Sequence, residues 1–342
     1  MQEQNPLRVA VLMATYNGSR YLEHQVQSLK HNRIQFTLHW LDDHSTDNSR
    51  EIVRSSASCA RVELREWHQP GRVGLPASFF VLLENAEADI YLFCDQDDIW
   101  QPGKIDAAVE ALSRDIEEPV LCYSDSFWFG VKQTEHLRRT SEILKFSRSE
   151  EYPLARRALF TGCFGGHAQA FTSPLRELFL RFERVAREYA FMHDWWMHHL
   201  ALMYGSIRFL WDAPAALFRR HEESFCQKHF GAIMRGRFAW REIQRMRLTY
   251  ARHAQGLSII ARLLPPSANA EAALGFARII SNLDKRHSLL NVIHLLRSRS
   301  LDTPLRTWPW WIAALVFSRS KEQLHGTDES RAAQGSIPSI GE

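Results

Sequence analysis

The stretch IYLFCDQDD, residues 90–98, decides how this sequence is interpreted. An apolar run that passes directly into Asp95, Asp97 and Asp98 predicts a buried strand with carboxylates at its carboxyl end. Carboxylates in this arrangement can converge on a hard divalent cation, Mg²⁺ or Mn²⁺, which can bridge and neutralise a diphosphate. The alternative is a loop of solvated or helix-capping aspartates ahead of a helix that starts near Lys104.

The segments before this stretch repeat its pattern of apolar run and polar loop. Short apolar runs typical of buried strands alternate with amphipathic helical patterns. The predicted strands cover residues 7–15, 36–41, 62–67 and 90–94, and the predicted helices cover residues 21–29, 48–54 and 77–86. Such alternation implies right-handed crossovers and a mostly parallel sheet with ligand sites at the carboxyl ends of its strands. The predicted fold class is therefore α/β and Rossmann-like.

The rest of the chain is less regular and then becomes helical. Further strands are predicted at residues 120–123, 165–171, 207–210 and 215–218, and a helix at residues 192–203. After Glu222 the pattern is helical, with no proline between Lys228 and Leu264. We therefore predict an α/β domain over residues 1–225, a basic helical region over 226–321 and a disordered tail over 322–342.

The charge is unevenly distributed along the chain. The net charge is +3, but residues 1–227 carry 31 acidic and 25 basic side chains, whereas residues 228–321 carry 16 basic and 4 acidic ones. Within the basic region, Arg235 and Arg237 lie near Phe238 and Trp240. Interfacial tryptophan and basic side chains suit anionic phospholipid, so we expect membrane-surface contact. The alternative is a helical bundle that packs its tryptophans inside.

Composition excludes several classes of protein. An apolar content of 45% with 24% charged residues is typical of globular proteins, and no apolar run is long enough to span a membrane. The five cysteines form no CxxC pair, and the first residues lack a secretory pattern. We expect a reduced, cytoplasmic protein that is peripheral on the inner face of the plasma membrane.

Two further polar loops follow the first two predicted strands. Asp42 and Asp43 open a loop that leads into a helix, and their carboxylates could accept hydrogen bonds from a base imide or from ribose hydroxyls. Ser45, Thr46 and Asp47 in the same loop are typical of a helix cap. The segment Ala14–Gly18 ends the first strand, where Tyr16 could stack on a base; by itself it indicates a turn.

Two later segments combine charged and aromatic side chains. Asp194 precedes Trp195 and Trp196 at a predicted helix start, and apolar surroundings can raise a carboxyl pKa toward that of a general base. The alternative is a capping aspartate followed by core tryptophans. His221 follows two arginines and could ligate a metal. The alternative is that this cluster of basic side chains lies on the protein surface without a ligand. His193, His198 and His199 lie on different helix faces, which disfavours a zinc site.

Taken in order, these motifs resemble the family 2 glycosyltransferases of the GT-A fold. The matching segments are residues 14–18, 42–47, 95–100 and 193–196. Within that family the chain looks most like rhamnosyltransferase-like enzymes of bacterial surface polysaccharide synthesis. The resemblance implies a GT-A domain with a mostly parallel mixed sheet, to which this chain adds a C-terminal helical extension.

The resemblance also implies roles for individual residues. Asp97 and His221 would bind Mg²⁺ or Mn²⁺, and Asp194 would be the catalytic base of an inverting transfer. Three aromatic residues would line the acceptor or sugar pocket: Trp100, Trp195 and Trp196. The residues that would hold the nucleotide sugar are Thr15, Tyr16, Asn17, Asp42, Asp43, Arg72, Asp95 and Gln96.

The sequence departs from the family pattern at three places. His44 stands where a glycine or a small polar residue is usual, and residues 71–80 replace a more usual asparagine-rich stretch. Arg72 in that stretch would contact phosphate or base. Gly166 and His167 stand where Gly-Cys is common. The acceptor pocket is accordingly the part of the family pattern that transfers least.

The resemblance leads us to expect transfer of a sugar, rhamnose from dTDP-L-rhamnose, to a hydroxyl of a growing bacterial surface glycan or lipid-linked glycan, such as lipopolysaccharide or O-antigen. One alternative is a metal-dependent phosphohydrolase, because Asp95 and Asp97 after a strand also resemble a haloacid dehalogenase-like nucleophile. The other is a non-enzymatic binder of anionic polymers. A nucleic-acid partner is not expected, because the acidic domain would repel it.

Overall fold

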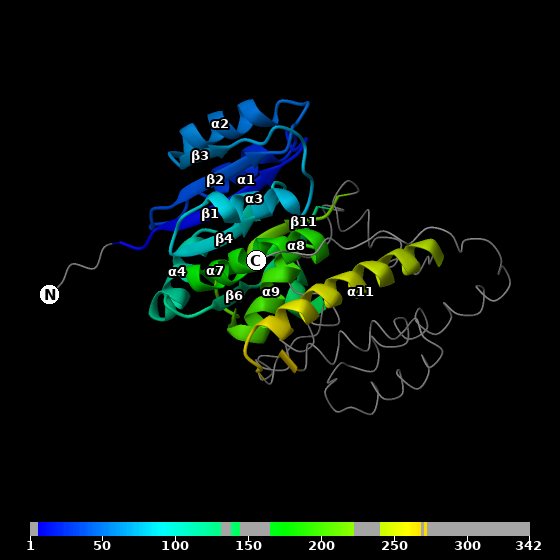
Figure 1. Ribbon diagram of the computed structural model, residues 1–342. Helices are drawn as coiled ribbons and strands as arrows, with labels where there is room; N and C mark the ends of the chain where they lie inside the picture. Colours follow the sequence, from blue (N-terminus) through cyan, green and yellow to red (C-terminus); the bar gives the residue numbers. More distant parts are fainter. Residues whose placement is uncertain (1–5, 131–137, 144–164, 222–239, 268–269, 272–342) are drawn as a thin grey trace.

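The computed structural model describes residues 6–130, 138–143, 165–221, 240–267 and 270–271 (Figure 1). Its main sheet has seven strands in the order β10-β6-β9-β4-β1-β2-β3. All neighbouring strands run parallel except β9, which is antiparallel to both β4 and β6. The strands are β1 (Val9–Thr15), β2 (Thr37–Asp42), β3 (Glu63–Trp67), β4 (Ile90–Cys94), β6 (Val120–Ser124), β9 (Gln169–Thr172) and β10 (Ser206–Leu210).

A second, four-stranded sheet lies at the carboxyl ends of the first. It has the order β5-β11-β7-β8, and β11 pairs parallel with β7 and antiparallel with β5. Its strands are β5 (Ile99–Trp100), β7 (Ser126–Phe129), β8 (Arg138–Arg139) and β11 (Ala216–Arg219). Because β5 and β7 follow directly after β4 and β6, this sheet carries residues 216–221 back to the aspartates that follow β4.

Helices cover both faces of the main sheet, since successive side chains of each strand point to opposite faces. Ala10 and Leu12 of β1 face one core, whereas Val11 and Met13 face the other. Helices α1 (Leu22–Ser28), α2 (Ser49–Ala60) and α4 (Lys104–Leu112) bury their apolar sides in the second of these cores. Helices α3 (Ala77–Asn85), α7 (Ser173–Arg181), α8 (Glu183–Tyr189) and α9 (His193–Tyr204) line the first. Helix α5 (Thr140–Ile143) packs beside β7 and β8.

The long helix α11 (Trp240–Leu263) packs against the same face of the molecule as α8 and α9 (Figure 1). Leu257 and Ile260 of α11 are fully buried in the core that also contains Trp196. This part of the basic region is therefore helical, as the sequence predicts, and it shares a core with the α/β domain.

The α/β class and the mostly parallel mixed sheet are confirmed. The predicted tail and residues 272–321, which include the tryptophans at positions 308, 310 and 311, lie outside the described residues. Arg235 and Arg237 also lie outside them. Within the described part of the chain, no helix has the length and apolar character needed to cross a membrane.

Candidate active site

The polar loops after β1, β2 and β4 meet at one edge of the main sheet. In the register of the sheet Thr15 pairs with Asp42, and Met13 pairs with Cys94. The carboxyl ends of these neighbouring parallel strands are consequently level, and residues distant in sequence lie together there. This is the edge at which open α/β sheets bind ligands.

Asp42 is held by donors on three sides. Its carboxylate accepts hydrogen bonds from the Thr15 hydroxyl at 3.1 Å and from the Ser45 N–H at 3.0 Å. Arg50 Nε lies 2.6 Å from the same carboxylate. Burial alone would raise the pKa of Asp42, but the hydrogen bonds from Ser45 and Arg50 outweigh it and lower the pKa. Asp42 is thus a fixed, ionised acceptor at the sheet edge.

Asn17 joins the loop after β1 to the loop after β2. Its N–H donates to Ser45 Oγ at 2.9 Å, and its side-chain oxygen accepts from the Thr46 N–H at 2.8 Å. Both Asn17 and His44 have positive φ, 47° and 63°, a conformation that asparagine tolerates better than most residues. Helix α2 has Asn48 as its N-cap residue, without a side-chain cap, and Asp47 lies beside the helix start, where it accepts the Ser49 N–H at 3.0 Å. Ser45 and Thr46 instead bind Asn17.

Asp43 anchors the loop that contains Arg72. Its two carboxylate oxygens accept the N–H groups of Val73 at 2.7 Å and Gly74 at 2.8 Å. Arg72 Nε lies 3.6 Å from the same carboxylate, and its guanidinium carbon lies 3.5 Å from the centre of the Tyr16 ring. Arg72 therefore covers a face of Tyr16, the residue predicted to stack on a base.

Gln96 ties the loop after β4 to the loop after β1. Its side-chain oxygen accepts the Tyr16 N–H at 2.9 Å, and its amide nitrogen donates to the Tyr16 carbonyl at 3.3 Å. Gly18 packs against this amide so closely that a Cβ there would lie 2.6 Å from Gln96 Oε1. The structure thus brings Thr15, Tyr16, Asn17 and Gln96 together, and the Gln96 side chain joins the two loops.

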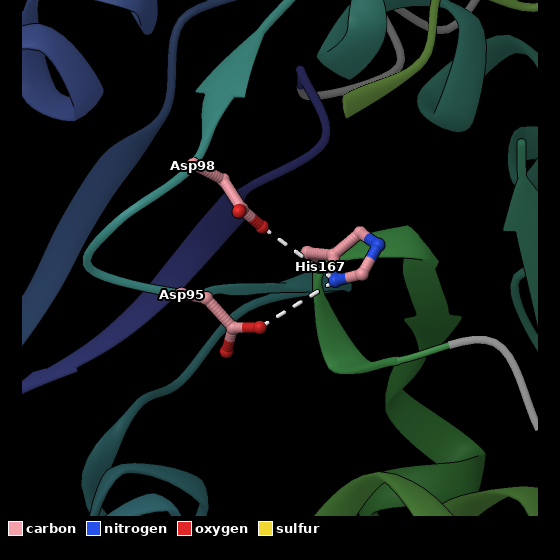
Figure 2. Close-up of side chains that lie close together, drawn as sticks. All are labelled: Asp95, Asp98 and His167. Carbon is pink, nitrogen blue, oxygen red and sulfur yellow. Dashed lines mark ion pairs between the residues drawn. The ribbon is translucent and has the colours of Figure 1, made fainter. Parts of the chain in front are cut away.

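Two aspartates that follow β4 and one histidine that precedes β9 form a group that we call the acidic cluster: Asp95, Asp98 and His167. His167 Nδ1 lies 3.5 Å from a carboxylate oxygen of Asp95 and 3.5 Å from one of Asp98 (Figure 2). One ligand atom from each of these residues falls within 4.8 Å of the others. Asp98 Oδ2 and both ring nitrogens of His167 are buried and have no hydrogen-bond partner among the described residues. Unpaired buried polar atoms are costly, so this donor set fits a divalent cation.

The pKa values of the two carboxyl groups of the cluster are shifted in opposite directions. Burial, reinforced by the charges of Asp97 and Asp95, raises the pKa of Asp98 well above its ordinary value. Burial would also raise the pKa of Asp95, but His167 outweighs it and lowers that pKa. A positive charge placed among these groups would relieve the repulsion between them.

Asp97 and His221, the predicted metal pair, are in direct contact. His221 Nε2 lies 2.6 Å from Asp97 Oδ2. Arg219 fixes this loop because its N–H donates to Asp98 at 2.9 Å and its Nε donates to the Asp97 carbonyl at 2.8 Å. The second sheet therefore delivers residues 219–221 to the aspartates. The predicted metal ligands lie next to the cluster of Asp95, Asp98 and His167, which offers a second set of ligand atoms.

Asp194 lies in the first turn of α9 and is 7% exposed. Its Oδ1 accepts the Trp195 N–H at 2.9 Å, and its carbonyl accepts from Gln169 Nε2 at 2.9 Å. Burial, with a smaller contribution from the charge of Asp95, raises the pKa of Asp194 to about 7. A carboxyl group with that pKa can accept a proton near neutral pH.

His193 supports the apolar surroundings of Asp194. Its ring stacks on Phe79 with centroids 3.8 Å apart and meets Phe93 edge-on at 4.6 Å. Burial lowers the pKa of His193 to about 4, so its ring is neutral at neutral pH. A neutral neighbour does not draw the pKa of Asp194 back down.

The prediction of a sugar pocket lined by three tryptophans is wrong for two of them. Trp100 is 1% exposed and Trp196 is 0% exposed, because each fills one of the two cores. Neither ring has a face to offer a sugar. Trp195 is partly exposed and packs edge-on against Phe191 at 5.5 Å.

The resemblance assigned no individual role to two residues of the cluster. Asp98 is the third carboxylate of its motif, and the sequence indicates a cation for that motif as a whole. His167 follows two glycines ahead of a strand, and only the antiparallel insertion of β9 between β4 and β6 brings it to the aspartates. Nothing local in the sequence reveals that neighbour relation.

Comparison with known proteins identifies related sequences. The model described as "Glycosyl transferase family 2" matches residues 10–178. The dTDP-rhamnosyl transferase RfbG of Shigella flexneri is 24% identical over 220 residues, which cover 62% of this chain and 72% of that protein. An uncharacterized glycosyltransferase of Nostoc sp., alr2836, is 29% identical over 107 residues. That match covers 30% of this chain and spans about a third (32%) of the Nostoc protein.

Solved structures share the fold. TarS residues 1–349 from S. aureus, in complex with UDP-GlcNAc, superpose with a TM-score of 0.55 and 17% identity over 90% of this chain and 79% of that chain. The mannosyltransferase PcManGT from Pyrobaculum calidifontis, in complex with GDP-Man and Mn²⁺, gives a TM-score of 0.50 and 19% identity over 94% of this chain and 88% of that chain. At these identities the likeness establishes the fold alone.

Proposed function

Residues 10–178 belong to glycosyl transferase family 2, and from this premise we propose that the protein is a metal-dependent, inverting glycosyltransferase. The observation that carries the proposal is the convergence at one sheet edge of hydrogen-bonded acceptor loops, an acidic cluster with unpaired polar atoms, and Asp194 with a pKa of about 7.

The loops after β1 and β2 would hold the nucleotide. Thr15, Asn17 and Asp42 present polar atoms at the sheet edge, and Asp43 fixes the loop of Arg72. Arg72 lies on Tyr16, so a base would stack on this pair or displace the guanidinium. Gln96 and Asp95 would line the part of the site that holds the ribose.

The acidic cluster would hold Mg²⁺ or Mn²⁺. Asp97 and His221 are the ligands we propose, together with Asp95, Asp98 and His167. When bound, such a cation supplies positive charge that neutralises the diphosphate as it leaves. The protein contributes the fixed positions of these groups, since Arg219 holds the backbone of Asp97 and the carboxylate of Asp98.

Asp194 would act as the general base. Its carboxylate takes the proton of an acceptor hydroxyl, whose oxygen attacks the anomeric carbon while the bond to the diphosphate oxygen breaks. A single displacement inverts the configuration at that carbon. Burial, with a smaller contribution from the charge of Asp95, keeps the pKa of Asp194 raised for this role.

The donor we propose is dTDP-L-rhamnose, supported by the 24% identity with RfbG. The acceptor would be a hydroxyl of a growing bacterial surface glycan, such as lipopolysaccharide or O-antigen, or of a lipid-linked glycan. A lipid-linked acceptor and the 16 basic residues in 228–321 would place the protein in the cytoplasm at the inner face of the plasma membrane. Flotation with anionic liposomes tests this location, because Arg235→Gln with Arg237→Gln should weaken binding.

A thermal-shift screen with UDP-, GDP- and dTDP-sugars, each with and without Mn²⁺, tests the proposed function. We expect dTDP-rhamnose with Mn²⁺ to give the largest stabilisation and chelation to remove it. Donors that stabilise are then assayed for sugar transfer against release of inorganic phosphate. Absence of any nucleotide effect, or phosphate release without transfer, would favour the phosphohydrolase or the anionic-polymer binder instead.

A further inference from the structure

We propose that His253 of helix α11 is a positioning residue for Asp194, so that the helical region completes the catalytic site. This inference rests on the proposed role of Asp194 as the base. His253 lies outside the residues that match the family model, and its side chain is 3% exposed. It contacts Phe191, in the junction between α8 and α9, and three residues of α9 itself: Trp195, Trp196 and His199.

Helix α11 approaches this junction closely because it has a glycine at the crossing. A Cβ at Gly256 would lie 2.4 Å from the Tyr189 Cβ and 2.8 Å from the Trp196 ring. Tyr189 ends α8, and Trp196 lies in the first turns of α9. Helix α11 therefore touches the chain immediately before and immediately after the junction.

His253 fixes the junction itself. The Phe191 N–H donates to His253 Nδ1 at 3.1 Å, and His253 Nε2 lies 3.3 Å from His199 Nδ1. The His253 ring also meets Trp196 edge-on at 5.1 Å and Trp195 at 6.4 Å. Burial, with the neighbouring His199 and His198, holds the pKa of His253 well below its usual range. The ring is therefore neutral, and one of its nitrogens has a lone pair to accept a hydrogen bond.

The start of α9 needs such support. Its N-cap residue, Met192, is extended and makes no side-chain cap, and Asp194 is the second residue of the helix. On the sheet side the Asp194 carbonyl is held by Gln169. On the opposite side the segment is held by His253 and by the glycine crossing. The backbone that carries the Asp194 carboxylate is thus held by contacts from both β9 and α11. A base displaced by about 1 Å can lose roughly a hundredfold in rate.

The test compares His253→Leu with His253→Asn in the full chain. Leucine keeps volume but removes the acceptor, whereas the Asn Oδ1 takes the place of Nδ1. We expect His253→Leu to lower kcat about 10- to 100-fold with nucleotide affinity unchanged, and His253→Asn to recover most of that loss. Ile260→Ala is the matched control, since it removes core packing from the same helix and should lower stability while kcat stays near wild type.

Hydrogen exchange of the peptide that contains Phe191 gives a readout independent of activity. We expect faster exchange in His253→Leu and near-normal exchange in His253→Asn. The proposal is overturned by wild-type kcat in His253→Leu, by a loss in His253→Asn equal to that in His253→Leu, or by an equal loss of kcat in Ile260→Ala. If the wild-type chain transfers no sugar with any donor, the proposed function fails, and exchange alone decides whether His253 holds the junction.

Discussion

The two halves of the site differ in how their carboxylates are paired. In the loops after β1 and β2, Asp42, Asp43 and Asp47 all accept hydrogen bonds from protein donors. The pKa values of Asp42 and Asp47 are lowered, because their hydrogen bonds outweigh burial. In the acidic cluster after β4, burial and like charges raise the pKa of Asp98, and both nitrogens of His167 lack a hydrogen-bond partner among the described residues.

We call the loops after β1 and β2 the paired half of the site, because their carboxylates are hydrogen-bonded. We call the acidic cluster the incomplete half, because it contains buried polar atoms without hydrogen-bond partners among the described residues. The paired loops need no ligand to be stable, so they can present a preformed shape to a nucleotide. The cluster keeps like charges and unpaired polar atoms close together, an arrangement that a bound cation stabilises. Asp194 belongs with the incomplete half, because it is buried and its pKa is raised for the same physical reason.

The largest expected effect is the loss of transfer in Asp194→Asn. Removing a general base costs roughly 100- to 10,000-fold, so kcat should fall by about a thousandfold. Donor affinity, measured by calorimetry, should change little, because Asp194 lies on the acceptor side of the proposed reaction. Asp89→Asn is the control at the opposite end of β4, where Asp89 binds the Arg8 N–H. Wild-type kcat in Asp194→Asn would refute the assignment of the base.

The pH dependence of stability tests the raised pKa of Asp194. The folded pKa is about 7 against an ordinary value of 3.8. Between these values the unfolded chain releases a proton that the folded chain keeps, so native stability falls as pH rises from about 4 to about 7 and then levels off. Asparagine cannot ionise. The free energy of unfolding of Asp194→Asn should therefore rise relative to that of the wild type over that interval, by about 4 kcal/mol at most. Urea unfolding at pH 4, 5.5 and 8, without metal, measures the gain, and a difference independent of pH would contradict it.

Cation binding should separate the two halves of the site. Mn²⁺ at a hundred times its Kd should stabilise the wild-type chain by about 2.7 kcal/mol, seen as a rise in Tm. His167→Ala and Asp97→Asn should lose most of that rise. Asp47→Asn, a change in the paired half, should keep it. An unchanged Mn²⁺ effect in both His167→Ala and Asp97→Asn would place the metal away from the acidic cluster and from the neighbouring Asp97.

Local sequence patterns were sufficient for the paired half. Thr15 and Asp42 lie at the ends of apolar runs, and the carboxyl ends of neighbouring parallel strands coincide, so their proximity could be predicted. The incomplete half depends on contacts between distant segments. His167 reaches the aspartates only because β9 inserts antiparallel between β4 and β6. No local pattern predicts which strand lies between two others.

The tryptophans illustrate the same limit. Trp195 and Trp196 are adjacent, but neighbouring residues of a helix point about 100° apart. Trp196 is thereby buried in the core under α11, whereas Trp195 is partly exposed. An aromatic residue beside a carboxylate therefore does not by itself indicate a sugar platform. Gly256 gives a similar lesson, since its role is visible only once α11 is packed on α8 and α9.

The smallest expected effect concerns the stability of the chain without ligands. Asp43→Ala removes the acceptor of the Val73 and Gly74 N–H groups and should cost about 1–3 kcal/mol of the free energy of unfolding. Asp43→Asn keeps one acceptor oxygen and should cost about half as much. Asp98→Asn should cost nothing or stabilise the cation-free chain, because it removes a buried carboxyl that like charges surround. Urea unfolding measures the free energy of unfolding of the three variants. If Asp98→Asn destabilises the chain as much as Asp43→Ala, the buried carboxyl of Asp98 does not destabilise the cation-free chain. The inference that the cluster binds a cation would then be wrong.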